Sequence, residues 1–127
     1  MENWYSKLYD KKDVTDPFVD VKLGKARIAK TAVIDNSLNP KWNEWFKVEV
    51  CHRADTLIFD VRDKDHAYTE VVGEVILDCQ HLINGQVVEG WFPIQKGSKV
   101  KIYFLFFSSF KAKSSQCLLI YEGYTRW

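Results

Sequence analysis

Residues 16–23 read Asp-Pro-Phe-Val-Asp-Val-Lys-Leu and carry the pattern that decides the fold. After the Asp-Pro turn dipeptide, apolar side chains alternate with Asp20 and Lys22. Because successive side chains of a strand point to opposite faces, this alternation is typical of a strand with one buried and one solvated face. The segment therefore predicts a half-buried β-strand.

Five further segments repeat the alternation, and they are centred on residues 46–50, 57–61, 75–77, 100–106 and 118–120. Residues 27–34 alternate less clearly but are rich in β-branched residues, so we expect another strand there. Turn-forming Asn, Asp, Gly and Pro separate these runs, and no long amphipathic helix is visible. Short strands joined by turns predict an all-β fold, an antiparallel β-sandwich, formed by one domain over residues 1–127.

Composition limits the classes of function that fit the chain. The 18 Lys and Arg residues balance 17 Asp and Glu residues, for a net charge of +1, which argues against a generally basic nucleic-acid binder. Three widely spaced Cys residues favour neither a disulfide framework nor a zinc site, and suit a reducing compartment. No apolar run approaches the length of a signal core or membrane span. We therefore expect a soluble, cytoplasmic chain without a nucleic-acid partner.

Two connections between the expected strands are unusually acidic. Residues 10–17 read Asp-Lys-Lys-Asp-Val-Thr-Asp-Pro, and residues 63–70 read Asp-Lys-Asp-His-Ala-Tyr-Thr-Glu. Calcium takes about six to eight hard oxygen ligands, so carboxylates that converge from several loops are what a calcium site needs. Taken alone, each segment is better explained as a solvated turn than as a calcium site, because Asp is common in turns.

Four motifs, in this order and spacing, resemble the C2 domain family: residues 15–19 (Thr-Asp-Pro-Phe-Val), 39–46 (Asn-Pro-Lys-Trp-Asn-Glu-Trp-Phe), 59–65 (Phe-Asp-Val-Arg-Asp-Lys-Asp) and 72–73 (Val-Gly). Residues 85–94, Gly-Gln-Val-Val-Glu-Gly-Trp-Phe-Pro-Ile, look most like the C2 domain at the amino end of plant-type phospholipase D. The resemblance covers about residues 10–107. It implies an eight-stranded antiparallel Greek-key β-sandwich whose three loops at one end bind calcium and dock on phospholipid.

The resemblance also implies a set of calcium ligands. Carried over position by position, these are Asp10 and Asp16 in the first loop, and Asp63, Asp65 and Glu70 in the third. Glu70 stands where the family usually has Asp, and the third loop is one residue shorter than its common form. The implied cofactor is Ca²⁺.

The family's usual first strand has no clear counterpart here, since only nine poorly alternating residues precede Asp10. A segment with that strand's pattern, Leu-Leu-Ile-Tyr-Glu, lies instead at residues 118–122. We expect it to form an interior strand in the place of the first, which would make the chain a circular permutant. The alternative is that residues 4–8 form a shortened first strand and the last segment pairs along an edge.

Candidate lipid contacts fall into two groups. Val14 and Tyr68 stand at the expected loop tips, and the amphipathic ring of Tyr suits the headgroup region. Four basic residues surround the expected turn at residue 24: Lys22, Lys25, Arg27 and Lys30. Similar domains hold phosphoinositide headgroups on such a face, although a solvated strand face explains the same residues.

We therefore expect calcium-dependent binding to anionic phospholipid membranes, with peripheral association. The alternative is a calcium-independent module that binds a protein partner. We do not expect an enzyme, because the phospholipase D motif His-x-Lys-x4-Asp is absent and no catalytic triad spacing is visible. Five aromatic residues are expected to pack in the core rather than stack on nucleic-acid bases: Trp42, Trp45, Phe46, Trp91 and Phe92.

Overall fold

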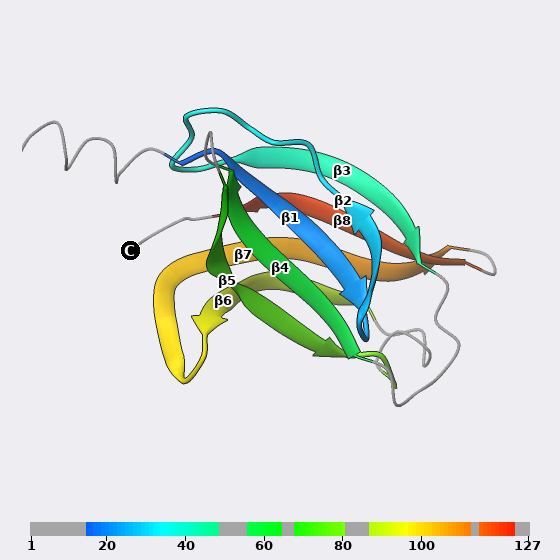
Figure 1. Cartoon of the computed structure of the whole chain (residues 1–127). Helices are drawn as coiled ribbons and strands as arrows, with labels where there is room; N and C mark the ends of the chain where they lie inside the picture. Colours follow the sequence, from blue (N-terminus) through cyan, green and yellow to red (C-terminus); the bar gives the residue numbers. More distant parts are fainter. Residues whose placement is uncertain (1–14, 49–55, 65–67, 81–86, 113–114, 124–127) are drawn as a thin grey trace, which may run out of the picture.

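The computed structural model describes residues 15–48, 56–64, 68–80, 87–112 and 115–123, and this part of the chain forms eight β-strands (Figure 1). All strand pairs are antiparallel. The strands are β1 (Pro17–Leu23), β2 (Ala26–Lys30), β3 (Lys41–Val48), β4 (Thr56–Lys64), β5 (Thr69–Asp78), β6 (Val88–Lys96), β7 (Lys99–Ala112) and β8 (Ser115–Gly123).

Hydrogen bonding links the strands in the order β2-β1-β4-β5-β6-β7-β8-β3. The link between β5 and β6 is minimal, because only Glu74 and Gln95 are paired there. The sheet folds over at this junction into two four-stranded layers, and Figure 1 shows β1 and β4 lying across β7. The expected eight-stranded antiparallel sandwich is confirmed.

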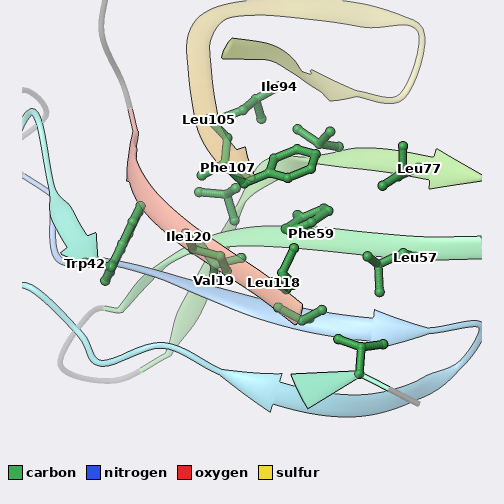
Figure 2. Close-up of a cluster of buried hydrophobic side chains, with 14 of the residues drawn as sticks. Val19, Trp42, Leu57, Phe59, Leu77, Ile94, Leu105, Phe107, Leu118 and Ile120 are labelled. Atoms are coloured by element: carbon green, nitrogen blue, oxygen red, sulfur yellow. The ribbon is translucent and has the colours of Figure 1, made fainter. Parts of the chain in front are cut away.

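One apolar cluster fills the space between the two layers. The alternation of β1 and β4 turns Val19, Phe59 and Val61 inward, and none of the three is exposed to solvent. The ring of Phe59 stacks on Phe107 of β7, in the opposite layer, with 4.2 Å between ring centroids (Figure 2). Burial of apolar side chains from both layers in one cluster is what holds the sandwich together.

Gly73 allows β5 and β6 to approach closely at the fold of the sheet. A Cβ atom at this position would lie 2.6 Å from Cγ2 of Ile94 and 2.7 Å from the carbonyl oxygen of Gln95. Both distances are shorter than real Cβ contacts, and the φ angle of +155° also disfavours a side chain. The Val-Gly motif of the sequence is thus explained by packing.

β8 is an interior strand, as expected, because it pairs with β7 on one side and with β3 on the other. Leu118 and Ile120 are buried in the core cluster. The alternative in which this segment pairs only along an edge is therefore wrong. Residues 4–8, the other candidate for the first strand, lie outside the described residues, so the circular permutation stays a prediction.

Two strand predictions differ from the structure. β6 was not predicted from alternation, because Gly90 and Pro93 interrupt its pattern. β2 ends at Lys30 although we expected a strand to residue 34; Thr31 and Ile34 still donate backbone hydrogen bonds to Val19 and Pro17 of β1. The chain thus stays beside β1 beyond β2 without a regular ladder.

The expected burial of the aromatic residues is correct for Trp42 and wrong for Trp45. Trp42 is 7% exposed, whereas Trp45 is 62% exposed. Because the two residues are three positions apart on β3, they fall on opposite faces of the strand. Phe92 packs against the core cluster and stacks on Phe107 at 4.5 Å.

The interior position of β8 predicts that Ile120→Ala is strongly destabilising. Ile120 is fully buried, so removing its side chain beyond Cβ leaves a cavity and should cost about 2–5 kcal/mol of unfolding free energy. The matched control is Ile76→Ala, the same deletion at a residue that is 58% exposed, with an expected cost of about 0.5 kcal/mol. Urea denaturation measures both. Equal losses in the two variants would contradict the placement of β8.

Candidate functional site

The two acidic segments of the sequence meet where β1 begins and β4 ends. Pro17 pairs with Asp63 in the β1–β4 ladder, so Asp16 lies beside Asp63. The backbone N–H of Asp16 donates to Oδ1 of Asp63 at 2.9 Å, and the N–H of Lys64 donates to the carbonyl oxygen of Asp16 at 2.9 Å. The structure thus brings together Asp16 and Asp63, and their use as ligands of one metal site stays a prediction.

A third connection, residues 31–40 between β2 and β3, is hydrogen-bonded to the same end of the sandwich. The N–H of Asn36 donates to Oδ1 of Asp16 at 2.7 Å. Thr15 and Ser37 bond in both directions: the Thr15 hydroxyl donates to the Ser37 carbonyl at 2.8 Å, and the Ser37 N–H donates to the Thr15 carbonyl at 2.8 Å. Asn36 has a φ of 53°, a left-handed conformation that Asn tolerates. The sequence predicts a strand as far as residue 34 and turns beyond it, but no role for this connection at the site.

Glu70 lies at the same end of the sandwich, because it is the cross-strand partner of Asp63 in the β4–β5 ladder. Directly paired residues of an antiparallel ladder project from the same face, with Cβ atoms about 5 Å apart. Asp16 and Asp63 are half-buried, whereas Glu70 is exposed. We call this region, with Asp16, Asp63, Glu70 and residues 31–40, the acidic loop end.

The acidic loop end supplies oxygen atoms, which are the ligands that calcium prefers. Asp10 and Asp65, the other two expected ligands, lie outside the described residues, as does Val14. Within the part of the chain that the structure describes, no three His, Cys, Asp or Glu residues are grouped closely enough to hold a metal ion. The described carboxylates therefore fit calcium by their chemistry, but form only part of a coordination shell.

Tyr68 stands immediately before β5 and is 60% exposed. It lies two residues before Glu70, at the acidic loop end. Its insertion among lipid headgroups stays a prediction. No helix in the described segments is both long and apolar enough to cross a membrane.

Two of the four expected basic contacts are paired with carboxylates on the outer face of β1 and β4. Nζ of Lys22 lies 3.0 Å from Oδ2 of Asp60, and Nη1 of Arg27 lies 3.3 Å from Oδ1 of Asp20. Asp20 and Asp60 are only 8% and 5% exposed. Lys22 and Arg27 therefore neutralise nearly buried carboxylates, which reduces the positive charge that they offer to a ligand.

The other two expected basic contacts have different surroundings. Lys25 is exposed in the turn between β1 and β2, next to Gly24. Nζ of Lys30 lies 4.8 Å above the ring centroid of Phe18, in cation–π contact. Lipid binding by Lys25 and Lys30, as by Lys22 and Arg27, stays a prediction.

Arg62 joins the two buried carboxylates. Its Nη2 lies 2.9 Å from Oδ2 of Asp60, and its Nε lies 3.8 Å from Oδ2 of Asp20. The sequence does not predict this role, because it depends on the pairing register of β1 and β4. Asp20 and Asp60 are direct cross-strand partners, and like charges in that position require cations around them. We call Asp20, Asp60, Lys22, Arg27 and Arg62 the ionic cluster.

The sharing of Arg62 predicts unequal effects for two substitutions. Arg62→Met removes the cation that contacts both Asp20 and Asp60, and should lower the unfolding free energy by about 2–3 kcal/mol because buried carboxylates lose compensation. Lys22→Met leaves Asp60 with Arg62, and should cost less than about 1 kcal/mol. Urea unfolding at neutral pH measures both. A Lys22 variant as unstable as the Arg62 variant would show that the cluster is not centred on Arg62.

Comparison with known proteins identifies relatives over most of the chain. The family model of the C2 domain matches residues 2–94. Phospholipase D gamma 3 of Arabidopsis thaliana is 40% identical over 83 residues, which cover 65% of this chain and 10% of that protein. Phospholipase D alpha 1 of Vigna unguiculata is 30% identical over 112 residues, covering 81% of this chain and 14% of the relative. The chain thus spans about a tenth of the curated relatives it matches.

Solved structures share the fold at lower identity. A structure of two C2 domains of Extended-Synaptotagmin 2 superposes with a TM-score of 0.60 and 20% identity, over 86% of this chain and 33% of that one. The calcium-bound structure of the same domains gives a TM-score of 0.59 and 21% identity, over 86% of this chain and 34% of that one. With the family match over residues 2–94, these findings show that the chain belongs to the C2 domain family.

Proposed function

We propose that this C2 domain binds anionic phospholipid membranes in a calcium-dependent manner through its acidic loop end. The observation that carries the proposal is the contact between the first and third loops, in which the Asp16 N–H donates to Oδ1 of Asp63. Two carboxylate residues from segments 47 positions apart in the chain are held side by side. Such convergence at one end of the sandwich supports a shared binding site over two independent acidic turns.

The chemistry of the acidic loop end suits a calcium ion shared with lipid. In this proposal Asp16 and Asp63 hold calcium together with Asp10 and Asp65, and Glu70 contributes from the neighbouring strand. Five side chains cannot easily fill the shells of two calcium ions, because each ion takes about six to eight oxygen atoms, so coordination positions stay open. Lipid phosphate oxygens fill those positions. The bound calcium neutralises the carboxylates of the acidic loop end, which would otherwise repel an anionic membrane.

Peripheral contact with the membrane is proposed to involve Tyr68 at the tip of the same end. An exposed Tyr ring gains by lying among lipid headgroups, where its body is apolar and its hydroxyl stays hydrated. The cytoplasmic leaflet is the anionic membrane surface that such a domain would meet. The basic face around Lys25 and Lys30 adds a secondary attraction, limited by the carboxylates that pair with Lys22 and Arg27.

We propose further that the chain acts as a binding domain rather than as an enzyme. Its matched relatives are named phospholipase D, but the match to gamma 3 covers only 10% of that protein. The competing proposal is calcium-independent binding to a protein. The 62% exposure of Trp45 on the edge strand β3 favours it, because Trp is enriched in protein interfaces.

Calcium is expected to raise the melting temperature. Binding to the native state alone stabilises it by about 2.7 kcal/mol at a hundredfold excess over the dissociation constant. For a chain of this size, at about 3–6 °C per kcal/mol, that corresponds to about 8–16 °C, measured by scanning calorimetry in millimolar calcium against chelator. Asp16→Asn and Asp63→Asn should abolish the shift, because each removes a charged ligand.

The matched control for the third loop is a pair of substitutions on β5. Glu70→Gln should reduce the calcium shift, whereas Glu74→Gln, at a residue that pairs with Asp60 in the middle of the ladder, should leave it unchanged. Identical melting curves of the parent chain in calcium and chelator would reject the metal site.

Sedimentation with phosphatidylserine vesicles should require calcium and fall as salt rises, because the attraction is screened over about 10 Å at 0.1 M ionic strength. Tyr68→Ala should weaken sedimentation several-fold without loss of the calcium-induced melting shift. Trp45→Ala, a loss of another exposed aromatic ring, should have no effect. Sedimentation that is the same in chelator as in calcium would count against the proposal and in favour of a calcium-independent module.

A further inference from the structure

A cavity of about 470 Å³ opens on the outer face of the layer formed by β6, β7, β8 and β3. It is open to solvent, its lining includes none of the acidic ligands and no residue of the ionic cluster, and its volume is within the range of small-molecule sites. Its lining residues are Lys41, Asn43, Glu89, Phe106, Tyr121 and Glu122.

Two aromatic rings line this cavity from different directions. The rings of Phe106 and Tyr121 have centroids 5.1 Å apart and planes at 88°, so they form two sides of a corner. Trp91 contacts Phe106 with the same separation and angle, and supports that ring from β6. Both lining rings are only half-buried. A corner of aromatic faces is the environment that binds an organic cation through cation–π contact.

The charges around the corner are of both signs, with a negative excess. Glu89 and Glu122 contribute two carboxylates, and Lys41 contributes one ammonium group. Nζ of Lys41 lies 4.0 Å from Oε2 of Glu122, at the outer limit of an ion pair, and 71% of the Lys41 side chain is exposed. Lys41 can therefore contact an anionic group of a ligand, and the carboxylates of Glu89 and Glu122 can attract a cationic group.

We propose that this cavity binds a phosphocholine group. The quaternary ammonium lies in the corner of Phe106 and Tyr121, near the carboxylate of Glu122, and the phosphate is contacted by Lys41. A quaternary ammonium has no N–H to satisfy, which suits a site that offers ring faces and diffuse negative charge. The ligand's separated charges match those of the lining, whereas a simple anion or an inorganic cation would match only one part of it.

The cavity is placed where a lipid headgroup could reach it. Lys41 begins β3 directly after residues 31–40, the segment that holds Asp16 through Asn36. The end of β8 is fixed to the same segment, since the N–H of Gly123 donates to the Pro40 carbonyl at 3.0 Å. The phosphocholine site therefore flanks the acidic loop end but shares none of its carboxylates, so it does not depend on calcium.

The test is a nuclear magnetic resonance titration of the full chain with phosphocholine in the presence of chelator. We expect saturable shifts of the backbone amides of Phe106, Tyr121 and Glu122. Glu122→Gln should weaken binding about two- to fivefold, because it removes a half-buried carboxylate beside the quaternary ammonium. Glu74→Gln, which removes a carboxylate from β5 in the other layer, should leave the affinity unchanged.

Two further variants test the phosphate contact and the ring contact separately, and the dispersion of the spectrum checks that the variant is folded. Lys41→Ala should weaken phosphocholine binding several-fold but leave tetramethylammonium binding undiminished, because only the phosphate contact is lost. Phe106→Leu should weaken both ligands while keeping a dispersed spectrum. Absence of saturable shifts with either ligand, or Glu122→Gln affinity equal to that of the parent chain, would overturn the proposal.

A parallel experiment with phosphatidylcholine vesicles in chelator distinguishes a lipid headgroup from a soluble choline ester as the source of the phosphocholine group. Retention of the chain on these vesicles, with loss in the Glu122→Gln variant, assigns a lipid headgroup. Binding of soluble phosphocholine without vesicle retention assigns a soluble choline ester, and supports the same site. Because no calcium is present in either arm, failure of the calcium proposal would not alter these outcomes.

Discussion

The antiparallel register of β1 and β4, with Val19 opposite Val61, is the constraint on which the rest of the structure depends. It turns the valines and Phe59 into the core, and it places Asp20 beside Asp60 on the outer face. At its end it sets the first acidic segment against the second. A slip of one residue would exchange the two faces of either strand. The core, the ionic cluster and the acidic loop end therefore have one common cause.

The ionic cluster explains why the proposed membrane contact depends on calcium rather than on basic residues. Lys22 and Arg27 belong to a basic segment, residues 22–30, yet both are paired with carboxylates that are nearly buried. Their positive charge is largely used within the protein. With a net charge of +1, the chain has little general attraction to an anionic surface. In the proposed function, calcium supplies the local positive charge that the fold does not provide.

Much of the fold was predictable from the sequence, because alternation identified β1, β4, β5 and the interior strand β8. β6 was missed because Gly90 and Pro93 interrupt its pattern, although long-range pairing with β7 makes it a strand. The approach of Asp16 to Asp63 was expected from the resemblance. The role of Arg62 was not, because it depends on which residues face each other across two strands, and the pairing partner of a strand cannot be read from its own period.

The central claim is that calcium and anionic lipid share the acidic loop end, and it is tested most directly by isothermal titration of calcium with and without phosphatidylserine vesicles. Because coupling between two ligands is reciprocal, the account predicts that vesicles raise the apparent calcium affinity, by about 5- to 150-fold, the usual range for coupled sites. The increase should disappear in the Asp63→Asn variant. A calcium affinity that is the same in the presence and absence of vesicles, or no calcium binding at all, would contradict the account.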